Sequence, residues 1–162
     1  MAEALQAQGR GRPRGRGGRN RLGASVLAQA FMRSGGRVPD LDEPARIAAL
    51  FAGVQALRAQ DLLLACHDRS DGGLFVTLCE MAFAGHVGVS LNIDLLVTEG
   101  NGIRDSLADS GEAKNWTAQV GERRNELSLR ALFNEELGVV IQVARADRDG
   151  VIAVLREHGL SR

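Results

Sequence analysis

The chain has 162 residues, and its 20 basic and 20 acidic residues give a formal net charge of zero, so the overall balance favours neither an acidic nor a basic partner. Hydrophobic residues make up 44% of the chain, which excludes a protein that is disordered throughout and fits one domain with an adequate core. No apolar run approaches the roughly 18 residues of a membrane span, and no apolar signal core follows Met1, so we expect a cytoplasmic protein without a membrane partner.

The first twenty residues differ from the rest of the chain. Residues 9–19 consist of arginine and glycine with one proline and contain no apolar side chain that could enter a core. We therefore expect residues 1–20 to be disordered. An arginine–glycine arm can follow nucleic-acid phosphates, which makes a nucleic-acid-binding module one alternative function, although no aromatic residue is present for base stacking.

Two helices are predicted next. A short helical pattern over residues 22–33 ends at Gly35-Gly36. A longer helix is expected over residues 43–59, with Asp42 as its N-cap and Pro44 in its first turn. Apolar residues recur there with a period near 3.6, which predicts one buried stripe. The stripe consists of Ile47, Leu50, Phe51, Val54 and Leu57.

An apolar run, a polar loop and a second apolar run follow. Residues 62–66 are continuously apolar, which is typical of a strand covered on both faces. The polar loop 67–73 then leads into a helix over residues 74–84. Alternating apolar residues over 87–93 predict a strand with one solvent-exposed face. Both cysteines lie inside these apolar runs, and we expect them to be small buried hydrophobic residues.

The second half of the chain begins with a polar stretch, residues 95–126, which we expect to be an excursion with its own local structure. A helix over 128–136, a strand over 139–143 and a final helix over 148–158 follow. The polar cluster Asn134-Glu135-Glu136 fits a solvated helix face. Helices that alternate with few strands predict an α+β fold, in which helices form layers on a mixed sheet.

The polar loop carries the residues with the most chemistry. Asp68 and Asp71 offer carboxylates, and Mg²⁺ takes one or two of these together with water and ligand phosphates. The Ser70 hydroxyl and the N–H groups of Ser70, Asp71, Gly72 and Gly73 could hold a phosphate at a helix N-terminus. Alternatively, Ser70 or Asp71 only caps the helix and Asp68 pairs with an arginine. The residues alone leave both interpretations open.

Other polar residues offer less. His67 at a strand end could act as a general base but fits a hydrogen-bonded structural residue, and His86 and His158 lie near expected helix C-termini. The sequence contains no zinc-spaced Cys/His cluster and no Gly-x-Ser-x-Gly nucleophile elbow. We therefore assign no catalytic residue.

A family resemblance extends this interpretation. Residues 67–74 with residues 77–86 resemble the phosphoribosylformylglycinamidine synthases, also called formylglycinamide ribonucleotide amidotransferases, in their large single-chain bacterial form. The segments 20–29, 38–41 and 132–138 agree with the same family. The long match around His67 makes the resemblance specific.

The resemblance implies a function in purine biosynthesis. Members of the family are ligases that convert formylglycinamide ribonucleotide, ATP and glutamine to formylglycinamidine ribonucleotide, and a separate glutaminase domain supplies ammonia. Residues 21–162 look like part of the second AIR-synthase-related C-terminal domain, an α+β domain with α/β/α layers. In the family this domain helps to close an auxiliary site for a structural ADP with Mg²⁺.

Carried over to this chain, the resemblance makes Asp68 a Mg²⁺ ligand and Ser70 a nucleotide contact, while Asp71, Gly72 and Gly73 shape the nucleotide-binding loop. ATP or ADP and Mg²⁺ are therefore the expected cofactors. The synthetase and glutaminase domains of the parent enzyme are the expected partners. Without them we expect the chain to be inactive and to bind nucleotide weakly.

The chain departs from the family pattern near both ends. Ala24 stands where the family has a glycine, and the arginine–glycine run stands where the family has an apolar strand. We therefore expect a domain that lacks its first strand and its final segment. Translation of GC-rich DNA in a shifted frame yields arginine, glycine, proline and alanine. We therefore hypothesise that the run arises from a reading-frame error, which the flanking DNA sequence would test. A non-catalytic fragment that docks on a synthetase partner is a further alternative.

Overall fold

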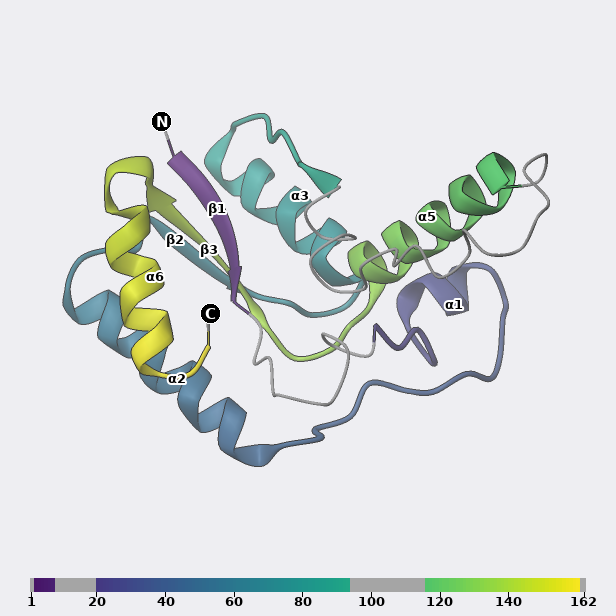
Figure 1. The fold of residues 1–162 in the computed structure, drawn as a ribbon, viewed down its shortest axis with the longest axis horizontal. Helices are drawn as coiled ribbons and strands as arrows, with labels where there is room; N and C mark the ends of the chain where they lie inside the picture. Colours follow the sequence, from purple (N-terminus) through teal and green to yellow (C-terminus); the bar gives the residue numbers. More distant parts are fainter. Residues whose placement is uncertain (1, 8–19, 94–115, 161–162) are drawn as a thin grey trace.

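The computed structural model describes residues 2–7, 20–93 and 116–160 of the chain, and for residues 2–7 and 116–123 it describes the backbone alone (Figure 1). Three strands form one sheet in the order β1-β3-β2. Both strand pairs are antiparallel, so the described sheet is antiparallel rather than mixed as expected. The strands are β1 (Ala2–Ala7), β2 (Ala65–Asp68) and β3 (Val139–Ala144).

Helices cover both faces of the sheet (Figure 1), which confirms the α+β fold with its α/β/α layers. α2 and α6 pack on one face, and α3 and α5 pack on the other. None of the helices in the described part of the chain is long and apolar enough to span a membrane. The helices are α1 (Val26–Ala30), α2 (Pro44–Ala59), α3 (Gly73–Gly85), α5 (Trp116–Phe133) and α6 (Arg148–Glu157), and a 3-10 turn (Arg145–Asp147) precedes α6.

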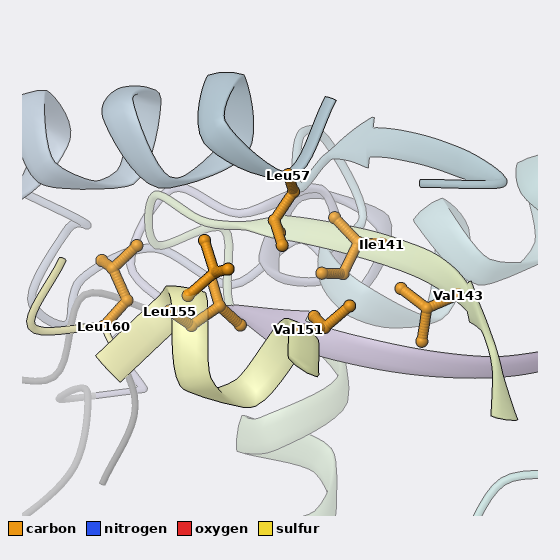
Figure 2. Packing of buried hydrophobic residues seen from close by; sticks show 7 residues of the cluster. Leu57, Ile141, Val143, Val151, Leu155 and Leu160 are labelled. Atoms are coloured by element: carbon orange, nitrogen blue, oxygen red, sulfur yellow. The ribbon is translucent and has the colours of Figure 1, made fainter. Parts of the chain in front are cut away.

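The central strand β3 organises the core because its side chains are buried on both faces. Ile141 and Val143 are fully buried with the side chains of α2 and α6 (Figure 2). Val140 points to the opposite face, where it packs with Leu74 and Leu78 of α3. Successive residues of a strand alternate in this way, and each buried aliphatic side chain contributes about 1.5–3 kcal/mol.

The structure corrects the expectation of disorder at the N-terminus. Ala2–Ala7 forms β1, which pairs with β3 from Ala2 opposite Ala144 to Ala7 opposite Val139. β1 therefore occupies one edge of β3, because it accepts and donates the hydrogen bonds of that edge. Residues 9–19 lie outside the described residues, so their disorder and the nucleic-acid-binding alternative stay predictions.

Two predicted strands also differ from the observed ones. Residues 87–93 form no strand, since a strand needs a hydrogen-bonded neighbour and the three described strands pair only with each other. β2 begins three residues later and ends two residues later than the predicted strand over 62–66, and it therefore includes His67 and Asp68. As an edge strand it is only half covered, so Cys66 is exposed rather than buried.

The helices agree better with prediction, but the start of α5 and the buried face of α2 differ. α5 begins at Trp116, inside the stretch 95–126 that was expected to be a polar excursion, and residues 95–115 of that stretch lie outside the described part. In α2 the buried face is Gly53 with Leu57, while Ile47 and Phe51 of the predicted stripe are exposed. Within the predicted stripe only Leu57 is fully buried, and Leu50 and Val54 are partly buried.

Candidate functional site

The polar loop connects the end of β2 to the start of α3. The Asp68 side chain is 79% exposed, and Ser70 and Asp71 are exposed as well. Gly72 and Gly73 are buried beneath them. The loop therefore presents two carboxylates and one hydroxyl to solvent, and the two glycines that follow them are buried.

Both glycines are required by the packing of α3. Each has a positive φ, 79° at Gly72 and 68° at Gly73, a conformation that other residues adopt at a cost. A Cβ at Gly72 would lie 2.2 Å from Cγ2 of Val76, and one at Gly73 would lie 2.6 Å from the carbonyl oxygen of Asn134. The start of α3 thus approaches the end of α5 more closely than any side chain allows.

The N–H groups of the loop are partly used by the protein itself. The Gly72 N–H donates to Oε1 of Glu135 at 2.9 Å, and the Gly73 N–H donates to the Ser70 carbonyl at 3.0 Å. Gly72 is the N-cap of α3 without a side-chain cap bond, so the alternative that Ser70 or Asp71 caps the helix is wrong. Within the described part of the chain, the N–H groups of Ser70 and Asp71 donate to no protein acceptor.

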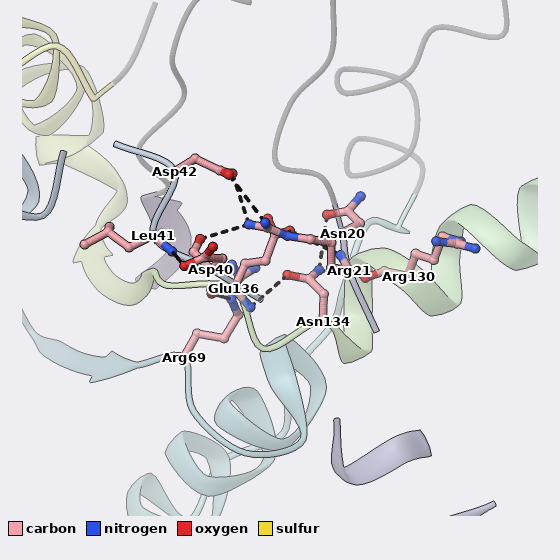
Figure 3. A network of polar contacts seen from close by, with 9 residues as sticks. All are labelled: Asn20, Arg21, Asp40, Leu41, Asp42, Arg69, Arg130, Asn134 and Glu136. Atoms are coloured by element: carbon pink, nitrogen blue, oxygen red, sulfur yellow. Dashed lines mark hydrogen bonds and ion pairs between the residues drawn. The ribbon is translucent and has the colours of Figure 1, made fainter. Parts of the chain in front are cut away.

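Behind the loop lies a buried polar network (Figure 3). Arg21, 8% exposed, donates from its backbone N–H at 3.2 Å and from Nε at 2.9 Å to Oε1 of Glu136. Its guanidinium also donates to Oδ2 of Asp42 at 3.0 Å and to the Asp40 carbonyl at 2.9 Å. Burial disfavours the charge of Arg21, but the hydrogen bonds and charges of Glu136 and Asp42 outweigh it and raise the pKa of Arg21.

Arg69 connects the loop to the same network. Its side chain is 4% exposed and donates from Nε to the Glu136 carbonyl, and its backbone N–H donates to the Gly138 carbonyl at 2.8 Å. Burial lowers the pKa of Arg69 to about 10, and the charge of Glu136 opposes this shift. Arg69 therefore remains charged at neutral pH and anchors the loop from beneath.

Asn134 closes the network at the end of α5. It is fully buried, and its amide donates to the carbonyls of Arg130 at 2.6 Å and Ala131 at 3.2 Å and to Oδ1 of Asn20 at 3.2 Å. These carbonyls belong to the last turn of α5, where intrahelical donors run out, and the Arg130 carbonyl also accepts the backbone N–H of Asn134 at 3.2 Å. The expectation that residues 134–136 form a solvated helix face is wrong, because Asn134 and Glu136 are interior residues.

The network joins four of the segments that carry the family resemblance. Residues 20–29, 38–41, 67–74 and 132–138 are far apart in the sequence and are linked by hydrogen bonds of Arg21, Glu135 and Glu136. Residue-by-residue reasoning missed Arg21, Glu136 and the role of Asp42. Asp42 binds Arg21, and Glu43 is the N-cap of α2 without a side-chain cap bond. The sequence signal for Arg21 and Glu136 is that both are charged residues within segments that resemble the family.

The polar contacts of His67 lie next to the exposed carboxylate of Asp68. His67 Nε2 lies 3.3 Å from Oε2 of Glu80, and its Nδ1 lies 2.6 Å from the Asp68 carbonyl oxygen. Among the described residues, no group of three or more His, Cys, Asp and Glu side chains could hold a metal ion. Mg²⁺ needs only one or two carboxylates when phosphates and water complete its shell, so Asp68 fits as one ligand of a shared site.

The geometry defines a small α/β/α-layered domain whose polar loop rests on a network of buried ion pairs. The model of the family described as "AIR synthase related protein, C-terminal domain" matches residues 16–162. The chain therefore belongs to this family, which occurs in ATP-using synthases and ligases of purine biosynthesis. The match begins within the arginine–glycine run, close to the domain start that we expected at residue 21.

Proposed function

We propose that this chain is part of the second AIR-synthase-related C-terminal domain of a large single-chain phosphoribosylformylglycinamidine synthase. That enzyme converts formylglycinamide ribonucleotide, ATP and glutamine to formylglycinamidine ribonucleotide. The observation that carries the proposal is the meeting of the four resembling segments in one buried network beneath an exposed polar loop. Segments that are distant in sequence, resemble the same family and meet in one place are expected to form the site of that family.

In this function the loop is one wall of an auxiliary site for Mg²⁺ and ADP. Asp68 binds the metal, because its exposed carboxylate is the hard oxygen ligand that Mg²⁺ prefers. The Ser70 hydroxyl and the N–H groups of Ser70 and Asp71 hold a phosphate, while Gly72 and Gly73 shape the loop. Bound Mg²⁺ and ADP would supply a structural bridge between domains rather than a reacting phosphoryl group.

The isolated chain contains only this wall. One carboxylate and a few exposed donors cannot replace the hydration of Mg²⁺ and of a diphosphate, so affinity depends on ligands from the synthetase partner domain. We expect the chain by itself to form no amidine. Isothermal titration with ADP and Mg²⁺ tests the predicted weak nucleotide affinity, and sub-micromolar binding by the isolated chain would contradict that prediction.

A domain exchange tests the site itself. The full chain, with β1 included, replaces the corresponding domain of a complete phosphoribosylformylglycinamidine synthase, and the nucleotide retained after purification is released with acid and quantified. The proposal predicts one retained ADP per chimera, which Asp68→Asn removes because it deletes the metal ligand. Asp61→Asn is the matched control, since Asp61 is exposed and its φ of 53° suits asparagine equally well. Retention that is equal in both variants would refute the role of Asp68.

A further inference from the structure

One carboxylate oxygen joins two distant parts of the chain. Oε1 of Glu135 accepts the Val26 N–H at 2.8 Å and the Gly72 N–H at 2.9 Å, from segments 109 and 63 residues away in sequence. We infer that Glu135 is a positioning residue that holds the loop 68–73 in register with the segment 21–26. The identity of the loop's ligand depends on the proposed function. The two hydrogen bonds to Oε1 of Glu135, called the clamp below, can be tested without any ligand.

The two N–H groups explain why a carboxylate lies there. Val26 is the first residue of α1, and Gly72 is the N-cap of α3. N–H groups at a helix start lack an intrahelical acceptor and carry partial positive charge, so an anion that accepts both is favourable. Ser25 already accepts the Ala28 N–H from α1, which leaves the Val26 N–H for Glu135.

The adjacent residue strengthens the same connection. Glu136 accepts the Arg21 N–H through its carboxylate, and its carbonyl accepts Nε of Arg69. Two neighbouring glutamates in the segment between α5 and β3 therefore hold both the N-terminal segment and the loop. Because the loop has left-handed backbone at Gly72 and Gly73, its shape depends on contacts of this kind rather than on regular secondary structure.

Amide hydrogen exchange on the full chain tests the clamp. In Glu135→Ala the Val26 and Gly72 amides should both exchange faster, by about tenfold to a hundredfold, as expected for loss of a hydrogen bond to a charged acceptor. Glu135→Gln should restore most of the protection at both, because the side-chain amide oxygen remains an acceptor. Glu126→Ala, at an exposed position on α5, should leave both amides unchanged. Faster exchange at only one of the two amides, or at neither, would overturn the inference.

A second variant keeps the test decisive if Glu135→Ala also loses protection of β3. Val26→Pro removes a single donor, and proline suits this position because Val26 opens α1 and Ser25 is extended with ψ at 159°. If the clamp couples the two segments, Gly72 exchanges faster in Val26→Pro while Ile141 in β3 keeps its protection. An unchanged rate at Gly72 refutes the coupling.

The domain-exchange chimera links the clamp to the site. Glu135→Ala should lower ADP retention and Glu135→Gln should preserve most of it, because the loop needs its position and not the charge of Glu135. If the unmutated chimera retains no ADP, the proposed function fails while the exchange results still decide the clamp. If ADP is retained equally in all three proteins, the clamp has no positioning role for the ligand.

Discussion

Neutralising Glu136 should destabilise the fold strongly, because its carboxylate pairs with the buried Arg21 and its charge also favours the charged form of the buried Arg69. Its side chain is 11% exposed and contacts Nε of Arg21 at 2.9 Å, and its charge also opposes the lowered pKa of Arg69. Removing one partner of a buried ion pair costs about 3–5 kcal/mol. Asp42 still pairs with Arg21, so we expect Glu136→Gln to lose about 3 kcal/mol, the lower end of that range. A domain is typically stable by only about 5–15 kcal/mol.

Urea unfolding followed by circular dichroism at fixed pH and salt measures this loss. Glu126→Gln is the matched control, because Glu126 forms an exposed ion pair with Arg130 at 2.8 Å on α5. Such a pair is worth about 0.3–0.5 kcal/mol. A double-mutant cycle with Arg21→Met should give a combined loss smaller than the sum of the single losses. If Glu136→Gln and Glu126→Gln lie within about 0.5 kcal/mol of each other, the reasoning from burial is refuted.

Three further predictions follow from backbone geometry and burial. Ala24 has a φ of 58°, so Ala24→Gly should raise unfolding stability by about 1 kcal/mol, whereas Ala28→Gly inside α1 should lower it; equal effects in urea unfolding would contradict this. Gly73→Ala should lower the unfolding midpoint far more than Gly88→Ala, since a Cβ meets a carbonyl at 2.6 Å in the first case and nothing within 4 Å in the second; similar midpoints would exclude this packing role. Although Cys66 is exposed, partial desolvation of its thiol, with a smaller effect of the nearby Asp68 carboxylate, raises its pKa, so the native thiol should react with iodoacetamide only at a higher pH than a free cysteine. The stability linked to this thiol is present below its unfolded pKa and is lost as pH rises through the folded pKa. Peptide mass spectrometry measures the pH at which alkylation of Cys66 is half complete, and a midpoint equal to or below that of a free cysteine would contradict the prediction.

The sequence by itself determined the local elements. Residues 43–59 were predicted to be helical and α2 spans Pro44–Ala59, while residues 148–158 contain α6 and residues 139–143 lie in β3. Helical periodicity, proline near a helix start and a short apolar run depend on neighbours in the chain, so they can be recognised without a fold. The layered α+β class followed from the order of these elements.

The tertiary structure alone decided which polar residues are interior. Asp42 was predicted to be a helix cap and Glu136 to be a solvated residue, yet both bind the buried Arg21, which lies 115 residues before Glu136. It also placed Ala2–Ala7 on the free edge of β3 and left residues 87–93 without a partner strand. Burial and strand pairing are set by distant segments that the topology brings together, and no local pattern records them.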